Sequence, residues 1–545
     1  MTEQKDRVVV RMYRGVLGDC FLVTVWRGDQ AKVAMIDCGV LQNVEPGPDL
    51  VAKLAAEVVA EVGEDALARV EGTKDAVRSI EADILAYLGK TTGGKLDLLV
   101  ITHDHYDHVA GFTLPDEENI FLQPTFEIGQ LWLSWVENPN DPQAQALAAR
   151  FSKAKLAVAL AAEVGKHAVG PVSEALDRVR GLAAFIGPVA HPALPAVTSK
   201  TKTTTQSIQA IREKVDRKTR YLEPGQVISK NDGIGLKTYV LAPPRSEKRL
   251  FKDSPTGKGE AREVYLTDVD EASAVAGVAL AQLHGLAMAG GMALEEKAQR
   301  LAVEDQDALD PLPFARPHRR DYPATDAAAA AAAAERPKGW EKLRAAYENE
   351  ADAYRSISGD WTDAADALAL KLDSDTNNSS LVLAFEIDED RMLLFPGDAQ
   401  IGSWESWGDQ LYPAMSGGGQ PQAAIDNILR RVVFYKVGHH ASHNATARAR
   451  GLELMTHPGL CAAIPVVEAV AKIQGPGRKT PGKGWKMPYA ELYARLEEKT
   501  HGRIVQGDGD PARERAAFGA DGADVTIRHE DRDSGGRWVE LTFHL

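Results

Sequence analysis

The spacing of apolar residues alternates between two periods along the chain, which predicts strands and helices in turn. Three apolar runs of strand length open the sequence, at residues 7–13, 21–26 and 32–36. Apolar residues at intervals of three and four then extend over about residues 49–88, which predicts helices. A further apolar run begins at Leu96. Strands, helix and strand in this order are expected for one αβ unit.

The same two periods predict further strands and helices in the rest of the chain. Strand patterns lie at residues 126–135, 221–228, 235–243, 381–385, 391–395, 432–437, 461–466 and 538–545. Helical patterns lie at about residues 141–185, 207–218, 268–303, 341–372 and 423–431. The polar residues 377–380 predict a loop, and the eight alanines at 327–334 fit either a helix or a flexible tether.

We expect one α/β domain over residues 1–545, in which helical segments interrupt a common core. The expected core segments are residues 7–112, 220–243, 374–470 and 486–545. Two mostly helical insertions, at about residues 113–219 and 244–372, would form a lid or a surface for a protein partner.

Composition narrows the class of protein. Apolar residues make up 44% of the 545 residues, which is typical of a globular protein with a sizeable core. No run of about eighteen apolar residues occurs, so we expect no membrane span and no membrane partner. The first residues lead directly into a strand pattern and do not resemble a signal peptide. Three cysteines (Cys20, Cys38 and Cys461) are too few for a disulfide framework and predict buried thiols. These features favour a cytoplasmic protein.

The formal net charge of −15 opposes broad, non-specific adhesion to nucleic acid. It leaves open a locally basic cleft. Two segments offer one: a run after residue 244 that contains Arg245, Lys248, Arg249 and Lys252, and the glycine-rich residues 475–486.

Four potential metal ligands follow the apolar run that begins at Leu96. They are His103, His105, Asp107 and His108. A strand period of two would direct the first three side chains to one face, and His108 can join them only if the backbone turns there. Imidazoles and a carboxylate at this spacing suit zinc or manganese. A polar loop with incidental histidines and a structural metal clip are the alternatives, and the position after a buried strand favours a metal site over the polar loop.

This motif resembles the signature of the metallo-β-lactamase fold superfamily, whose members are mostly metal-dependent hydrolases. The opening of the chain, with Asp19 in a glycine-aspartate turn before a strand and Asp37-Cys-Gly39 after the next, is similar to the soluble hydrolase domain of ComEC-like competence proteins. The resemblance implies a four-layer αβ/βα sandwich, and it covers roughly half of the chain.

The resemblance also implies a ligand set for two divalent metal ions, zinc or manganese. Asp398 matches the carboxylate that bridges both ions, and Asp37 matches an aspartate that supports the site from behind the ligands. His439 or His440 matches the last ligand, and we favour His439 because it comes first after its strand. One ion would then take Asp107, His108, Asp398 and His439. The other would take His103, His105 and Asp398 with one further ligand.

The region that supplies this further ligand in many superfamily members has no histidine here. Asp375, Asn377, Asn378 or water would fill the position, and more oxygen among the ligands favours manganese. With His439 as a ligand, His440, Ser442 or His443 remains to contact substrate or donate a proton. We expect Asp107, His440 and Ser442 to take part in catalysis and His443 to be a surface residue.

Two metal ions can hold a bridging hydroxide that is nucleophilic near neutral pH. We therefore expect a metal-dependent hydrolase, with phosphodiester cleavage of a nucleic acid or nucleotide as the favoured reaction. Basic residues of segment 475–486 would hold phosphates while Trp485 stacks on a base; the basic residues are Arg478, Lys479, Lys483 and Lys486. A solvated loop is the alternative for this segment, which also has Met487-Pro-Tyr489 where ComEC-like domains often carry His-Pro-Ser.

Two other functions remain open. An acyl hydrolase, such as a lactonase or thioesterase, would have an apolar cleft with the basic loop far from the metal ions. A binding module of a multi-protein system would retain metal weakly and turn over no substrate.

Overall fold

A computed structural model describes most of the chain. The described residues are 6–41, 56–68, 72–165, 172–189, 202–252, 360–412, 421–444, 446–474, 484–519, 525–530 and 536–545. Within these segments, no helix combines the length and the apolar character needed to cross a lipid bilayer. The alanine run and the expected helix at 268–303 lie outside the described residues.

The first sheet contains eight strands in the order β14-β15-β1-β2-β3-β4-β5-β6. Their bounds are β1 (Arg7–Tyr13), β2 (Cys20–Arg27), β3 (Gln30–Cys38), β4 (Lys95–Val100), β5 (Glu127–Ser134), β6 (Thr219–Leu222), β14 (Val525–His529) and β15 (Trp538–His544). Pairing is antiparallel from β14 to β3 and parallel from β3 to β6. The C-terminal strands therefore return to the first strand of the chain.

The second sheet contains seven strands in the order β13-β12-β11-β10-β9-β8-β7. Their bounds are β7 (Val227–Ile228), β8 (Lys237–Ala242), β9 (Val382–Glu386), β10 (Met392–Phe395), β11 (Val432–Lys436), β12 (Cys461–Ile464) and β13 (Ile504–Gln506). Pairing is antiparallel from β7 to β10 and parallel from β10 to β13. Each sheet thus has a parallel part, whose strands end at one edge of the sheet.

Helices cover the outer faces of both sheets. The covering helices are α4 (Thr73–Thr91), α8 (Thr204–Val215), α15 (Ile401–Ser406), α16 (Pro421–Arg430), α17 (Glu468–Lys472), α18 (Ala490–Thr500) and α19 (Pro511–Phe518). On the first sheet, Ile84 of α4 and Ile211 of α8 belong to the same apolar cluster as Leu99 of β4. On the second sheet, Ile428 of α16 belongs to the same cluster as Tyr435 of β11.

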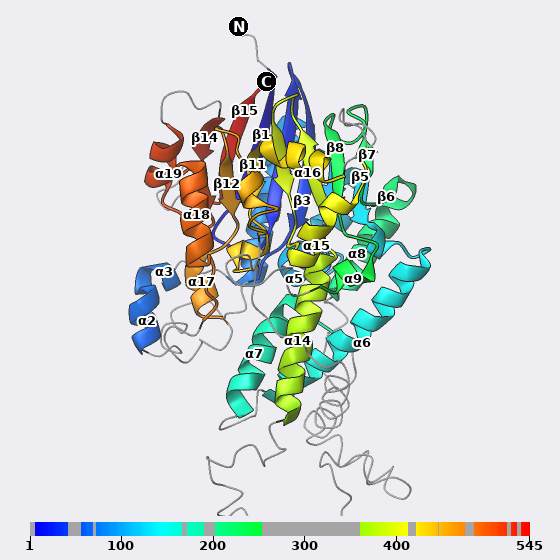
Figure 1. Cartoon of the computed structure of the whole chain (residues 1–545), viewed down its shortest axis with the longest axis vertical. Coiled ribbons are helices and arrows are strands. Elements are labelled where there is room, and N and C mark those ends of the chain that lie inside the picture. The colour runs from blue at the N-terminus through cyan, green and yellow to red at the C-terminus, as the bar shows by residue number, and fades with distance from the viewer. Residues whose placement is uncertain are drawn as a thin grey trace, which may run out of the picture.

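A separate apolar cluster fills the space between the two sheets. Phe21 and Val100 of the first sheet belong to it together with Phe385, Phe395 and Phe434 of the second. Because strand side chains alternate between the two faces, each sheet can pack on its partner with one face and on helices with the other. The protein is a mixed α/β sandwich with the layers helix, sheet, sheet and helix (Figure 1).

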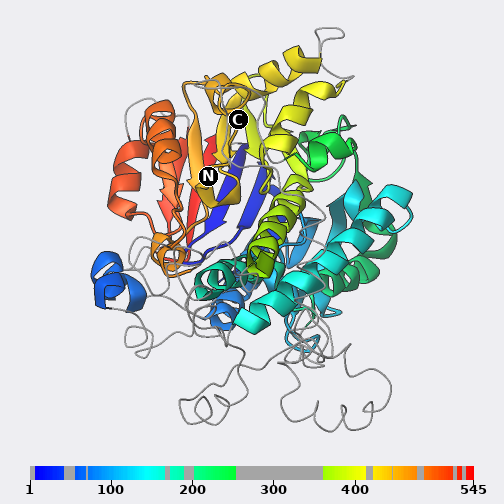
Figure 2. The ribbon, with the colours of Figure 1, turned by 60° about the horizontal axis from the view of Figure 1, so that its bottom comes forward.

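Three helices of the two expected insertions pack together although they are far apart in sequence. They are α6 (Pro142–Gly165), α7 (Val172–Ile186) and α14 (Asp360–Asn378). Phe151, Val179 and Leu372, one from each helix, share a small apolar cluster. The helices extend beyond the ends of the strands (Figure 1), and the view from that end shows α14 beside α6 (Figure 2). We call this group the insertion bundle.

Two sequence predictions of local structure were wrong. The expected strand at residues 221–228 divides between two sheets, because Leu222 ends β6 in the first sheet and Val227 begins β7 in the second. The polar residues 377–380 do not form a loop throughout, since α14 continues to Asn378. The smaller elements are α2 (Ala56–Val62), α3 (Glu64–Ala68), α5 (Tyr106–Val109) and α9 (Glu247–Leu250).

Candidate metal centre

The histidine-rich motif begins after β4 and ends in the short helix α5. His105 is the residue that precedes this helix, and Asp107 and His108 lie within it. The side chains therefore converge through a loop and a helical turn, not through the alternation of a strand, because β4 already ends at Val100. The turn expected at His108 is this helix. His103, His105, Asp107 and His108 are all buried.

The second sheet brings further candidate ligands to the same place. Asp398 follows β10, and His440 follows the neighbouring parallel strand β11. One donor atom from each of Asp107, His108, Asp398 and His440 lies within 4.8 Å of the others. His440 Nε2 is 2.6 Å from Asp107 Oδ2, and His108 Nε2 is 3.2 Å from Asp398 Oδ2. The site therefore lies where strands of both sheets end.

His440 lies beside Asp107, at the position that we expected for His439. His440, not His439, joins the four-residue cluster, and its Nδ1 lies 3.0 Å from the carbonyl oxygen of Pro465. His439 Nδ1 instead lies 2.8 Å from Ser442 Oγ. The backbone takes positive φ at both histidines and at Ala441, and this reversal turns the second histidine toward Asp107. The geometry therefore favours His440 over His439 as the candidate ligand.

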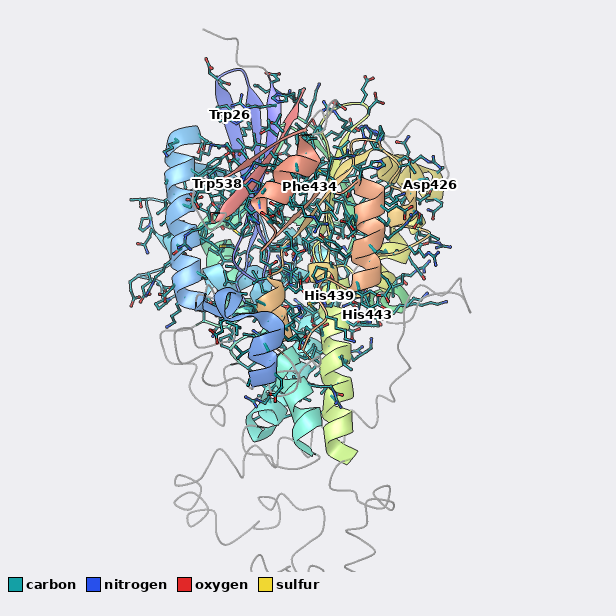
Figure 3. All side chains as sticks on the ribbon, turned by 90° about the vertical axis from the view of Figure 1, so that its left-hand side faces the viewer. Trp26, Asp426, Phe434, His439, His443 and Trp538 are labelled. Carbon is teal, nitrogen blue, oxygen red and sulfur yellow. The ribbon has the colours of Figure 1, made fainter. Side chains whose placement is uncertain are left out.

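Figure 3 shows His439 and His443 at the end of the sheets nearest the insertion bundle, opposite Trp26. His443 is exposed, as the sequence predicted. Ser442 is buried and lies beside His439, so its hydroxyl orients that ring.

Asp37 contacts the site from behind His108. Its Oδ2 lies 2.7 Å from His108 Nδ1, and its Oδ1 accepts a hydrogen bond from the backbone N–H of Thr102. A carboxylate at the far nitrogen of an imidazole fixes the ring orientation and directs Nε2 to a metal ion. This placement matches the supporting role that the sequence suggested for Asp37.

Several buried polar atoms of the cluster have no hydrogen-bond partner among the described residues. They are His103 Nε2, His105 Nε2, Asp107 Oδ1, and the pair His108 Nε2 and Asp398 Oδ2, which lie 3.2 Å apart without hydrogen-bond geometry. A buried polar atom without a partner costs about 1–3 kcal/mol, so five in one place need a common explanation. Nitrogen and carboxylate donors that face one another in this way fit divalent metal ions.

The charges of the site also fit cations. Five carboxylates of this region are buried, namely Asp19, Asp37, Asp107, Asp373 and Asp398, and the ammonium group of Lys436 is buried with two of them. Lys436 Nζ forms an ion pair with Asp19 and donates to Asp398 Oδ1 at 2.9 Å. Although burial opposes charge, Lys436 and His108 lower the pKa of Asp398 well below its usual range. A group with this excess of carboxylates attracts positive charge.

The pKa shifts of the histidines also fit cation binding. Burial is the main cause that lowers the pKa of His103 well below its usual value and that of His105 to about 4. Both imidazoles are then neutral at pH 7, which is the form that binds a metal ion. Against the effect of burial, the carboxylates of Asp398, Asp19 and Asp37 raise the pKa of His108. These carboxylates create a local negative potential that favours a cation.

Two of the three side chains proposed as an extra ligand are engaged elsewhere. Asp375 accepts a hydrogen bond from Lys371, and Asn378 donates to the carbonyl oxygen of Lys252 and accepts from the backbone of Ser403. Asn377 is fully buried, and its Oδ1 has no partner among the described residues. Of these three side chains, Asn377 alone has an oxygen without a hydrogen-bond partner among the described residues.

Three of the four cations in the basic run after residue 244 are paired with carboxylates, and the fourth, Lys248, is exposed. Arg245 pairs with Glu223 and Asp141, and Arg249 pairs with Glu405 and Asp409. Lys252 also pairs with Glu405. These cations hold segments of the protein together.

Part of the second basic segment can be placed beside the site. Trp485 stacks on Phe185 of α7 with ring centroids 4.9 Å apart, and Phe185 lies 6.0 Å from the ring of His105. Lys486 is exposed. Arg478, Lys479 and Lys483 lie outside the described residues, so their role stays a prediction.

Three residues of the site were not predicted as functional: Asp19, Lys436 and Asp373. Asp19 lies in the glycine-aspartate turn, and Lys436 ends β11. For Lys436 the sequence did contain a signal, because this lysine lies within the apolar run 432–437 and a buried charge needs a partner. The prediction of buried, free thiols at Cys20, Cys38 and Cys461 is confirmed.

Comparisons of the chain with family models, curated proteins and solved structures gave no match.

Proposed function

We propose that this protein is a metal-dependent hydrolase of the metallo-β-lactamase fold, similar to the soluble hydrolase domain of ComEC-like proteins, and that it cleaves phosphodiesters. The observation that carries the proposal is the convergence of unpartnered donor atoms from the ends of both sheets. The helix–sheet–sheet–helix layers and the parallel strands that lead to Asp398 and His440 support the same assignment.

The donor atoms suggest how two cations would be held. One would take Asp107, His108, Asp398 and His440, and the other His103, His105 and Asp398. Asp398 Oδ1 accepts from Lys436 Nζ and from the backbone N–H of His439, whereas Oδ2 has no hydrogen-bond partner among the described residues and would be available to a cation. Divalent ions at such a site make water nucleophilic near neutral pH and neutralise charge on a phosphate.

The chain's own residues have defined tasks in this proposal. Asp37 and the carbonyl oxygen of Pro465 orient the rings of His108 and His440. Lys436 fixes the carboxylate of Asp398. Phe185 is buried between His105 and Trp485, and the half-buried Trp485 would offer an aromatic surface to a nucleobase or another planar leaving group.

Hydrolysis of bis-p-nitrophenyl phosphate with added Zn²⁺ or Mn²⁺ tests this proposal. Wild type should release nitrophenol, and Asp107→Ala should abolish the reaction. His443→Ala changes an exposed histidine outside the cluster and is the matched control, which should keep wild-type activity.

A second substrate, p-nitrophenyl acetate, separates the reaction classes. Metal-dependent cleavage of the acetate without cleavage of the phosphate would overturn the phosphodiester assignment and favour an acyl hydrolase. Bound metal with no turnover of either substrate would favour a binding module.

A further inference from the structure

Two polar side chains of α14 lie one helical turn apart beside the metal centre. Asn377 Nδ2 donates to Asp373 Oδ2 at 3.2 Å and lies 3.4 Å from His439 Nε2. Asp373 Oδ2 is 3.9 Å from the same nitrogen. The backbone N–H of His439 donates to Asp398 Oδ1, so this histidine contacts the α14 pair through its ring and Asp398 through its backbone.

The remaining oxygen of each side chain is buried and has no hydrogen-bond partner among the described residues. These atoms are Asp373 Oδ1 and Asn377 Oδ1, and the exposed fractions of the two residues are 9% and 0%. Asp375 of the same helix differs, because its carboxylate forms an ion pair with Lys371. Two unpartnered oxygens on one side of a helix are costly unless they bind a ligand.

Electrostatic interactions show that Asp373 shares the buried region of the other carboxylates. Burial is the largest cause that raises its pKa well above the usual range, and Asp107 and Asp398 raise the pKa further. A cation among these three carboxylates would offset their mutual repulsion.

The helix that carries Asp373, α14, packs against the other two helices of the insertion bundle. Leu372 of α14 packs in the same cluster as Val179 of α7 and Phe151 of α6. Lys155 of α6 in turn forms an ion pair with Asp104, which lies between the candidate ligands His103 and His105. The bundle therefore meets the histidine motif through Lys155 and Phe185, and it presents Asp373 and Asn377 from α14.

We propose that Asp373 and Asn377 are further metal ligands of this centre, on the side of Asp107 and Asp398. The inference rests on the proposed function, and it makes the insertion bundle part of the metal centre. The oxygen donors of these two side chains would favour manganese over a nitrogen-rich zinc site.

Metal binding by Asp373→Asn tests the inference, with Asp375→Asn as the matched control. Both variants make the same chemical change on one helix two residues apart. We would titrate the metal-free full chain with Mn²⁺ by calorimetry and record the electron paramagnetic resonance spectrum of the loaded protein. Wild type and Asp375→Asn should bind about two Mn²⁺ per chain with a spin-coupled spectrum. Asp373→Asn should bind one ion at least about tenfold more weakly and give an uncoupled spectrum.

The outcomes separate this inference from the proposed function. Two coupled ions with unchanged affinity in Asp373→Asn would overturn the inference alone. No metal binding by wild type would overturn the proposed function and the inference with it. If Asp373→Asn does not fold, Asn377→Ala replaces it, and wild-type affinity for both ions in Asn377→Ala would equally contradict the proposed ligand set.

Discussion

His440 Nε2 lies 2.6 Å from Asp107 Oδ2, although the two residues are 333 positions apart in the sequence. Asp107 belongs to the helix that follows a strand of the first sheet, and His440 follows a strand of the second. The contact joins the ends of the two sheets at a point where both side chains are buried. A metal ion at this point would be held by both halves of the fold.

Asp37→Asn should weaken metal binding without unfolding the protein. Asn tolerates the left-handed backbone at this position, where φ is 57°. Its amide group can no longer accept from both Thr102 and the His108 ring, so the ring loses its fixed orientation. We expect affinity to fall about 10–100-fold in a competition titration with a metal-binding dye. Asp29→Asn, in an exposed turn, is the control, and equal affinities of the two variants would refute the role of Asp37.

Lys436→Met should lower the free energy of unfolding by about 3–5 kcal/mol in urea denaturation of the metal-free protein. The substitution leaves Asp19 and Asp398 buried without their ammonium partner. Adding Asp19→Asn to this variant removes one of the two unpaired charges and should restore part of the lost stability. A double variant no more stable than Lys436→Met would show that the ion pair does not balance the site.

Gly39→Ala should disrupt the metal centre. A Cβ atom at residue 39 would lie 1.5 Å from the carbonyl oxygen of Asp107, so the backbone that carries this ligand must move. Gly89→Ala is the control, because a Cβ atom there meets nothing within 4 Å in an exposed part of α4. We expect Gly39→Ala to bind less metal than wild type and to melt at a lower temperature. In Gly89→Ala the free energy of unfolding should rise by about 0.5–1 kcal/mol. Wild-type metal content in Gly39→Ala would contradict this packing.

Glu81 should make stability depend on pH. Burial raises its pKa from 4.5 to about 8, so between these values the unfolded state has lost a proton that the folded state keeps. Stability therefore falls as pH rises through this window and levels off above it. Glu81→Gln should match wild type near pH 5 and exceed it by about 2–4 kcal/mol near pH 9. Parallel stability curves for the two proteins would refute this, and the exposed Glu127→Gln serves as control.

The sequence predicted most of the sheet strands and the convergence of the side chains between His103 and His108, because both depend on short-range spacing. Apolar runs at 7–13, 391–395 and 432–437 match β1, β10 and β11 of the structure closely. The choice between His439 and His440 could not be predicted in this way. It depends on positive φ at consecutive residues, which sequence spacing does not reveal.

Contacts between distant segments account for the other differences. Asn and Ser are weak helix formers, so the sequence predicted a loop at residues 377–380. The apolar residues Ala369 and Leu372 pack in the insertion bundle and support α14 as far as Asn378. Packing of this kind outweighs local propensity, and it brought Asp373 to a position that the sequence alone did not suggest.

Metal content is the most direct test of the proposed centre. Elemental analysis by mass spectrometry would compare wild type with His440→Ala and His439→Ala after equilibration with Zn²⁺ or Mn²⁺ and removal of free metal. We predict about two ions per chain in wild type and His439→Ala, and about one or none in His440→Ala. Loss of metal in His439→Ala with retention in His440→Ala, or no metal in wild type, would contradict the account.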